Sequence, residues 1–300
     1  MANTVVYNKH DYVTSLRKRL NRPVNWMDVM NVQISDVRTI VTGALTVEPV
    51  VVTGTRGTAM THQDFTIAAT TLTINNFRNI PIFIDEADRF QQSYFGSPEI
   101  AAFQARQISE YLEAQMLAQH ASWVDFGQGD LDNTINDDTA TITVSATNID
   151  NLIRAIKRKI HVNNGIEFAL EHGYFTIWRP TDWEVLEEFA MASGFTEADR
   201  ALKSGIPVQK GFHYMGVDHY LSTQHTANHL FAGVKKVGKD LGILRGTYGM
   251  VKFIENPSDG NGPLFGLGIH GRVDYGWAFP SDATPTLQRV QEMGIDVNVA

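Results

Sequence analysis

The strongest periodic pattern in the chain lies between Ser97 and Ala121. Apolar residues recur there at near-helical spacing, at Ile100, Phe103, Ile108, Tyr111, Leu112 and Met116. Ser97 is a good N-cap, Pro98 suits the first helical position, and Glu99 suits the positive end of a helix. A helix of about 25 residues would be a rod of roughly 37 Å, which is long for a globular enzyme.

A turn-rich stretch separates two β-prone segments that precede this helix. Val47–Val52 favours a strand, Gly54–Thr58 favours a turn, and the Thr- and Ile-rich run Phe65–Ile74 favours a second strand. The pattern predicts a long two-stranded hairpin or loop. Because it is too polar for a core and an isolated ribbon is marginal alone, we expect it to lie against a neighbouring subunit.

The rest of the chain alternates between predicted helices, strands and loops. Residues 1–45 are interpreted as an arm, with a short basic helix near Tyr12–Leu20 that Pro23 would end. Strands are expected at Thr139–Val144, at Tyr174–Trp178, in two short pieces within Gly205–Leu221, at Tyr248–Ile254 and at Leu264–Trp277. Helices are expected from Asn148 or Asp150 to about Ile160 and from Thr181 or Asp182 to about Met191, with a loop at Gly127–Asp138. The mixture predicts an α+β fold with one dominant helix.

Composition narrows the class of protein. The 300 residues are 43% hydrophobic and 19% charged, which supports a packed core. The absence of cysteine excludes disulfides, cysteine nucleophiles and thiolate metal sites. No apolar run approaches the ~20 residues of a membrane helix, and Lys9, His10 and Asp11 interrupt any signal peptide. We therefore expect a protein made in the cytoplasm without a membrane partner.

Basic residues form two weak clusters in a chain whose net charge is −8. The first cluster lies in the arm and holds Lys9, Arg17, Lys18, Arg19 and Arg22. The second holds Arg154, Lys157, Arg158 and Lys159. Either cluster fits a solvated helix face, and contact with nucleic acid is the alternative.

The segment Ile82–Asp88 resembles the acidic box of ATP-dependent RNA helicases, in which an apolar strand delivers carboxylates to Mg²⁺. Ser145–Thr147 imitates a later helicase motif. Such enzymes need a phosphate-binding Gly-Lys-Thr loop upstream, and none precedes Asp85. The segment is therefore interpreted as the end of a strand with solvated acids.

A second motif, Gly233–Asp240, fits a phosphate-binding loop in its first seven positions. The eighth position should be Ser or Thr, whose hydroxyl binds Mg²⁺, and Asp240 would repel phosphate instead. The next segment, Leu241–Gly246, is a poor helix. No nucleotide site is expected here, and no catalytic or cofactor-binding residue is assigned.

Four histidines crowd one region, at His213, His219, His225 and His229. His225 and His229 have the i, i+4 spacing that can share a metal ion on a helix. The sequence between them has no apolar stripe and no zinc-protease glutamate, so no metal ligand is assigned. Solvated or hydrogen-bonded side chains are the interpretation.

The order of the elements resembles the major capsid proteins of tailed bacteriophages, the Hong Kong 97-type fold. In that family an arm, an extended loop and a long spine helix follow one another, as the arm, the polar hairpin with Leu72–Ile84 and the helix Ser97–Ala121 do here. The later segments that agree are Tyr174–Pro180 with its Thr181-capped helix, Gly205–Thr223, Phe231–Val234 and Gly268–Pro280. The resemblance covers nearly the whole chain.

This resemblance implies a division of the chain into four parts. They are an N-terminal arm (1–46), an extended loop (47–84), a peripheral domain (85–145 and 250–280) with the spine helix at 97–121, and an axial domain (146–249 and 281–300). It also implies a structural protein of the virion, without catalysis or a cofactor. Such proteins self-assemble through pentamers and hexamers into an icosahedral head.

The implied partners are other copies of the chain, a separate scaffolding protein, a portal protein and packaged double-stranded DNA bound without sequence specificity. Arg17, Lys18, Arg19 and Arg22 of the arm would face the DNA or the scaffold. Some relatives crosslink their subunits through a lysine of the extended loop. Because no lysine lies between Lys18 and Lys157, we expect no such crosslink.

Two other functions stay open. An encapsulin, the shell protein of a bacterial nanocompartment, has a similar fold and encloses a cargo enzyme instead of a genome. An ATPase or helicase is the alternative from another class, and it would depend on the acidic box at Asp85.

Overall fold

The computed structural model has the mixed α+β architecture that the sequence pattern predicts. It describes residues 25–45, 53–54, 56, 67–85, 98–134, 138–192, 212–225, 228–248, 250–255, 257–258, 264–279, 290 and 292–300. The predicted arm helix at Tyr12–Leu20 and the predicted strand at Val47–Val52 lie outside these residues. None of the described helices combines the length and the hydropathy of a membrane span.

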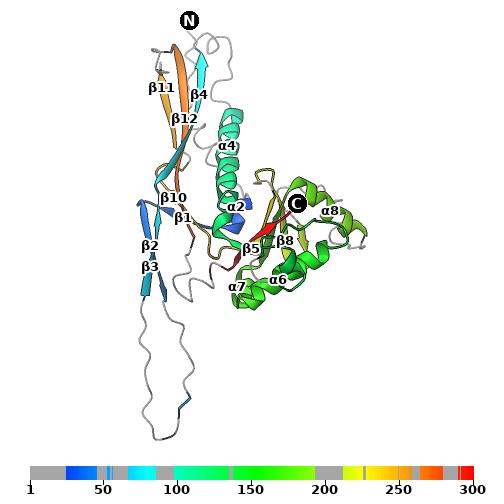
Figure 1. Ribbon diagram of the computed structural model, residues 1–300. Helices are drawn as coiled ribbons and strands as arrows, with labels where there is room; N and C mark the ends of the chain where they lie inside the picture. Colours follow the sequence, from blue (N-terminus) through cyan, green and yellow to red (C-terminus); the bar gives the residue numbers. More distant parts are fainter. Residues whose placement is uncertain are drawn as a thin grey trace.

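The described elements alternate along the chain (Figure 1). The helices are α2 (Asn25–Val29), α4 (Pro98–Leu117), the 3-10 helix η1 (His120–Ser122), α5 (Gln128–Leu131), α6 (Ile149–Val162), α7 (Ile166–His172) and α8 (Pro180–Ala192). The strands are β1 (Asn31–Ser35), β2 (Thr39–Leu45), β3 (Ile67–Thr73), β4 (Asn76–Asp85), β5 (Val124–Phe126), β6 (Tyr174–Trp178), β7 (Phe212–Tyr214), β8 (Val217–Leu221), β9 (His229–Val234), β10 (Asp240–Leu244), β11 (Met250–Glu255), β12 (Gly266–Ala278) and β13 (Gly294–Asn298).

The first sheet is built around β12, a strand of 13 residues. On one side β12 pairs antiparallel with all of β4, from Gly266–Asp85 to Tyr275–Asn76. On its other side β11 and β10 pair with it one after the other, and β1 adds to β10 in parallel. The predicted strands at Tyr248–Ile254 and Leu264–Trp277 are confirmed as β11 and β12.

The predicted long helix is confirmed as α4, which lies along the first sheet (Figure 1). It ends at Leu117 rather than Ala121, and its 20 residues span about 30 Å. Gln104, which is fully buried, donates from Nε2 to the backbone oxygens of Ile80 on β4 (3.1 Å) and Ile269 on β12 (3.2 Å). These bonds fix the helix across the two longest strands.

The face that α4 turns to the sheet differs in part from the prediction. Ile108, Leu112 and Met116 are buried, as expected. Phe103 is 58% exposed instead, because small or short side chains at Ala101 and Ala105 fill the buried positions of that turn. Small residues let the helix lie close to the strands, a choice that a search for large apolar residues overlooks.

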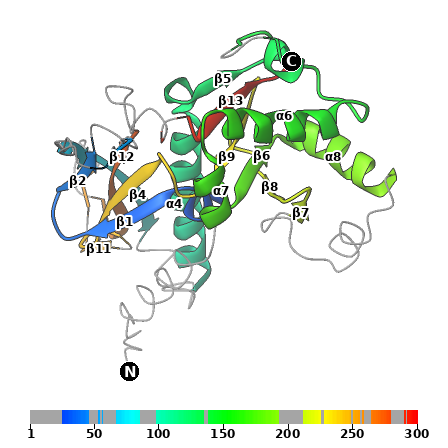
Figure 2. The same cartoon turned by 90° about the horizontal axis from the view of Figure 1, so that it is seen from below.

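The second sheet has the strand order β5-β13-β9-β6-β8-β7 within the described residues. Both of its faces are covered. Helices α6 and α8 cover one face (Figure 2). Along β6, Phe175 and Ile177 belong to the core that includes α4 and the first sheet, whereas Trp178 belongs to the core that includes α6 and α8. Successive strand residues point to opposite faces, so this near-continuous apolar run serves both cores. The predicted strand Tyr174–Trp178 is confirmed as β6, and the two predicted helices that flank it in sequence are confirmed as α6 and α8.

Strands β2 and β3 form a two-stranded antiparallel ribbon that projects from the first sheet (Figure 1). The pairing runs from Thr39–Thr73 at its root to Leu45–Ile67. The predicted strand Phe65–Ile74 is therefore confirmed as β3. Its described partner, however, is β2, from a part of the chain that was predicted to be an arm.

Residues 25–45 are integrated into the fold rather than being an arm, which corrects that part of the prediction. Val29 and Met30 of the α2 region are buried in the core beside α4, and β1 extends the first sheet. The side chain of Asn31 donates to Asp240 (2.7 Å), 209 positions away. The hydrophobic pattern around β1 is mixed because this strand is stabilised by pairing with the distant strand β10. The remaining domain limits stay a prediction.

Three other segments also differ from expectation. Thr139–Val144 is not a strand, since only Ile142 makes an isolated bridge, to Val299. The predicted loop Gly127–Asp138 contains the short helix α5. The segment after the phosphate-loop motif is strand β10, paired on both sides, which explains why it makes a poor helix.

Candidate functional site

The lysine of the phosphate-loop motif is buried and bonds to the protein backbone. Lys239 is 1% exposed, and its ammonium group donates to the backbone oxygens of Val234 (3.1 Å), Val237 (2.9 Å) and Met293 (3.3 Å). Burial lowers the pKa of Lys239 to about 7. The next residue begins β10, so no helix N-terminus is present to bind a phosphate. The motif is therefore an internal structural feature.

The acidic box begins at the end of β4. Asp85 is exposed and pairs in register with Gly266 at the end of the long β4–β12 ladder. The rest of the box, Glu86–Asp88, lies outside the described residues. The strand end that was expected at Asp85 is confirmed.

The second basic cluster on α6 is mostly engaged within the chain. Lys159 is 8% exposed and forms an ion pair with Asp130 (3.1 Å). Arg158 donates to the backbone oxygen of Asp130 (2.7 Å), and Lys157 donates to that of Met215 (2.9 Å). Only Arg154 matches the expected solvated helix face, with its i, i+4 partner Asp150. The first cluster, Arg17, Lys18, Arg19 and Arg22, lies outside the described residues.

Three of the four histidines make hydrogen bonds, as expected: His213, His219 and His229. His219 is fully buried, and its ring nitrogens contact Thr176 Oγ1 (2.6 Å) and the backbone oxygen of Tyr214 (3.2 Å). Burial lowers the pKa of His219 to about 3. His213 is exposed and lies 2.7 Å from a carboxylate oxygen of Asp218.

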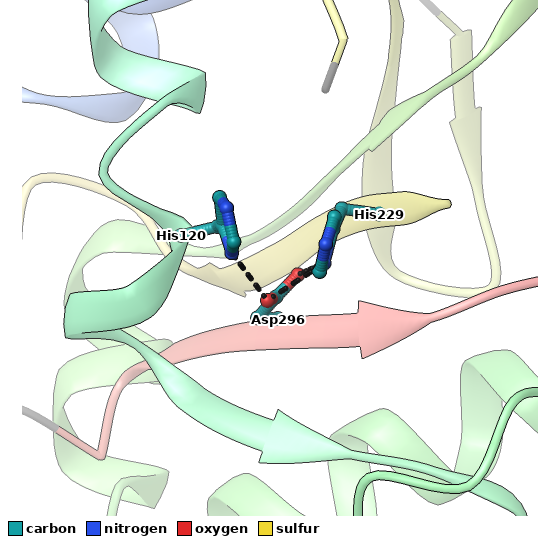
Figure 3. Close-up of side chains that lie close together, drawn as sticks. All are labelled: His120, His229 and Asp296. Atoms are coloured by element: carbon teal, nitrogen blue, oxygen red, sulfur yellow. Dashed lines mark hydrogen bonds and ion pairs between the residues drawn. The ribbon is translucent and has the colours of Figure 1, made fainter. Parts of the chain in front are cut away.

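The pair His225 and His229 does not share a helix, which corrects the geometry considered for a metal site. His229 is the first residue of strand β9, whereas His225 precedes that strand. Burial lowers the pKa of His225 to about 4. His229 instead lies beside His120 and Asp296 (Figure 3). Burial raises the pKa of the Asp296 carboxyl. His120 and Asp296 were missed because no sequence motif connects them to His229.

The root of the ribbon lies on two paired glycines. Gly242 of β10 and Gly276 of β12 are register partners. A Cβ atom at Gly276 would lie 2.0 Å from the backbone oxygen of Thr73, and one at Gly242 would lie 2.9 Å from Leu72 Cδ2. Any side chain at Gly276 would collide with this backbone. The ribbon therefore approaches the sheet closely at one place.

A buried carboxylate fastens the same region. Asp274, which is 3% exposed, accepts from Arg272 Nε (2.6 Å) and from Arg38 Nη2 (3.4 Å). Arg38 lies in the turn between β1 and β2, and the Arg272 guanidinium lies 4.9 Å from the centre of the Phe77 ring. Charge and packing thus connect β12 to the turn that leads into the ribbon.

Beyond its root the ribbon is open to solvent. Val41 is 63% exposed, and Ala69 and Thr71 are exposed as well. Within the described residues, β2 and β3 pair only with each other. An isolated two-stranded ribbon is marginally stable, and free strand edges readily pair with another chain. These properties make the ribbon a candidate interaction surface.

A second exposed surface lies at α7, a helix that the sequence pattern did not predict. Two apolar side chains four residues apart are exposed on α7, Ile166 (49% exposed) and Leu170 (82%), and Val162 at the end of the preceding helix α6 is 63% exposed. An apolar stripe that faces solvent on a short helix is typical of a surface that another molecule covers. The i, i+4 spacing is visible in the sequence, but a core position is the usual reading of such spacing.

No protein-family model and no curated protein matches this sequence. Solved structures are nevertheless similar to it. They include the capsid of the cyanophage P-SCSP1u, with 12% identity, a TM-score of 0.58, and coverage of 93% of this chain and 88% of that chain. The capsid of an empty GTA particle has 9% identity, a TM-score of 0.61, and coverage of 92% and 90%. A virus-like particle from Pyrococcus furiosus has 9% identity, a TM-score of 0.55, and coverage of 96% and 98%.

The similarity spans nearly the whole of this chain and of the chains to which it is similar. It is therefore not limited to one sheet or one domain. The chain has the fold of phage capsid proteins.

Proposed function

We propose that this chain is the major capsid protein of a tailed bacteriophage, which self-assembles into the icosahedral head around the genome. The observation that carries the proposal is the whole-length similarity in fold to capsid chains. The exposed ribbon and the exposed apolar stripe at α7 support it, because both are surfaces that other copies of the chain can cover.

In this proposal each element takes the role that the Hong Kong 97-type resemblance implies. Helix α4 is the spine helix, and the first sheet with β4, β11 and β12 is the core of the peripheral domain. The second sheet with α6 and α8 is the axial domain. The ribbon β2–β3 is the base of the extended loop in this proposal, and the pairing of Thr39 with Thr73 supports a start near residue 39 rather than residue 47.

The ribbon pairs with a neighbouring subunit in the assembled shell. Among the described residues no other strand pairs with its edges, and β-strand addition satisfies free backbone groups without requiring large apolar side chains. Many modest contacts of this kind, repeated by symmetry, stabilise a closed shell. The basic arm residues Arg17, Lys18, Arg19 and Arg22 face the interior, toward the DNA or a scaffolding protein.

The encapsulin alternative is supported by one observation, the similarity to the virus-like particle from Pyrococcus furiosus over 96% of this chain. The two functions share a shell and differ in its contents. A phage head holds genomic DNA, whereas a nanocompartment holds a cargo enzyme.

Electron microscopy of the purified full-length chain tests the proposal, with the chain expressed alone and together with the genes that neighbour its own. We expect uniform hollow shells in at least one of the two preparations. DNA in particles from an infection supports the phage head, and a packaged enzyme supports the encapsulin. Only monomers or small dimers in both preparations would contradict a shell protein. ATP hydrolysis that Asp85→Ala abolishes would support the enzyme instead.

A further inference from the structure

Two histidines and one aspartate from distant parts of the chain converge on one point (Figure 3). His120 lies in η1, directly after the long helix α4. His229 is the first residue of β9, and Asp296 lies in β13, the strand beside it. The cluster therefore lies where the end of the long helix meets the second sheet.

The donor atoms of this cluster have the spacing of a metal site. Nδ1 of His229 lies 2.9 Å from Asp296 Oδ2, and Nδ1 of His120 lies 3.3 Å from the same oxygen. All three donor atoms lie within 4.8 Å of one another. Ligand atoms around a tetrahedral zinc ion are about 3.3 Å apart, given metal–ligand bonds of about 2.0–2.1 Å. Small rotations of the side chains would suffice to accommodate an ion.

The two imidazole rings are stacked, with their centres 4.0 Å apart and an angle of 30° between their planes. Both rings thus direct Nδ1 to one carboxylate, as Figure 3 shows. Without a metal ion, His229 Nδ1 carries a hydrogen and donates it to the carboxylate of Asp296. A bound ion would take the place of this hydrogen and of the one on His120 Nδ1. Two protonated rings at this separation would repel each other.

Access and charge also suit a cation. The side chains of His120 and His229 are 28% and 20% exposed, so an ion can enter from solvent, whereas that of Asp296 is 2% exposed. Asp125 of β5 is the parallel register partner of Asp296, which places a second carboxylate on the same face of the sheet. The cluster thus offers one carboxylate and two imidazole nitrogens to an ion, with a second carboxylate nearby.

We propose that His120, His229 and Asp296 bind one divalent transition-metal ion, of the class to which Zn²⁺ belongs. Imidazole donors select such ions over Mg²⁺ and Ca²⁺, which prefer oxygen ligands. The ion connects the end of α4 to β9 and β13, and it therefore stabilises the junction between the helix and the second sheet. This inference is independent of the proposed shell function, because all three ligands belong to one chain.

Titration of the untagged, chelator-treated full-length chain with Co²⁺ and Zn²⁺ tests the site. We expect one ion per chain, visible d–d absorption of tetrahedral Co²⁺, and displacement of Co²⁺ by Zn²⁺. Zinc at about 100 times its Kd should raise the melting temperature by about 5 °C. His120→Ala and His229→Ala should each weaken binding by about 100-fold or more.

The chain provides a matched control in His213, which pairs with Asp218 at 2.7 Å and lies outside the proposed site. His213→Ala should leave both the affinity and the melting shift unchanged. His120 is half-buried in a short 3-10 turn, so His120→Asn provides a second variant that keeps the fold if His229→Ala does not. Equal binding by the wild type, His120→Ala and His213→Ala would overturn the proposal, as would a stoichiometry well below one in the wild type.

Discussion

At the scale of single residues, the hydrogen-bond partners of His219 favour its neutral form. The indole N–H of Trp178 donates to Nδ1 (3.0 Å), and Nε2 lies 3.2 Å from the backbone oxygen of Tyr214, which can only accept. The proton of the neutral ring is therefore on Nε2. A second proton on Nδ1 would face the N–H of Trp178 in a fully buried site, which agrees with a pKa of about 3 caused by burial.

Replacing His219 by Gln should weaken the dependence of stability on acid pH. The pKa of His219 is about 3 in the folded chain and 6.5 in the unfolded chain, so only the unfolded chain binds the proton between these values. Stability is unaffected above pH 6.5 and falls as the pH drops toward 3. The wild type should lose about 2 kcal/mol from this residue between pH 7.5 and pH 5.

Urea unfolding of the free subunit at the two pH values measures this loss. Gln lacks a titratable ring, so the variant should lose about 2 kcal/mol less than the wild type over the same interval. Equal pH dependence in His219→Gln and the wild type would show that His219 is not held neutral.

Single residues also show where prediction from sequence ends. Hydrogen-bonded histidines were predicted, and His219 and His213 are such residues. The cluster at His229 was not predicted, because Asp296 is 67 positions away and lies in an ordinary apolar strand. Nothing local distinguishes a carboxylate that strand pairing will bring beside two imidazoles.

At the scale of elements, local periodicity predicted α4, α6, α8, β6, β11 and β12. These elements carry their signal in their own apolar spacing, caps or alternation. The strands β1, β10 and β13 carry little signal of their own, since long-range pairing makes them strands. In the ribbon, β3 was predicted correctly, but its partner in the structure is β2 rather than the predicted segment Val47–Val52. Several nearby β-prone segments fit a polar hairpin equally well.

The exposed stripe of α7 predicts a variant that folds but does not assemble. Leu170 is 82% exposed, so Leu170→Glu removes almost no buried area within the subunit, and stability should change by only about 0.5 kcal/mol. In a shell where a neighbouring copy covers this stripe, a buried unpaired carboxylate should strongly reduce assembly. Particle yield in sucrose gradients and the melting temperature of the free subunit check the two effects.

Glu171→Gln is the matched control, since the neighbouring Glu171 side chain is 73% exposed and already polar. This variant should assemble as the wild type does. Normal shells from Leu170→Glu would show that α7 lies outside the contacts between subunits, and a lowered melting temperature would show that the stripe has a role within the chain.

At the scale of the whole molecule, the order of elements predicted more than any motif. Neither nucleotide-like motif predicted the fold: Lys239 is buried among backbone carbonyls, and Asp85 ends strand β4 while the rest of its motif lies outside the described residues. The sequence of ribbon, long helix and two sheets gave the fold class. Packing explains the difference, because a motif needs its context whereas a series of elements specifies how layers can pack.

The lysine distribution predicts how the assembled particle behaves in denaturant. No lysine lies between Lys18 and Lys157, so the ribbon and the long helix carry no amine for an amide crosslink. Boiled particles should therefore give a single band near the 33.4 kDa chain mass on a denaturing gel. A ladder of covalent multimers would contradict this expectation.

The glycine contact at the root of the ribbon has a mechanical consequence. The ribbon is attached at one end, where Thr73 lies against Gly276 without the spacing that a side chain would provide. A force applied to the outer part of the ribbon would therefore be transmitted to β12, the central strand of the first sheet. In a shell, the stiffness of that joint would set how much a subunit deforms when internal pressure pulls on its neighbours.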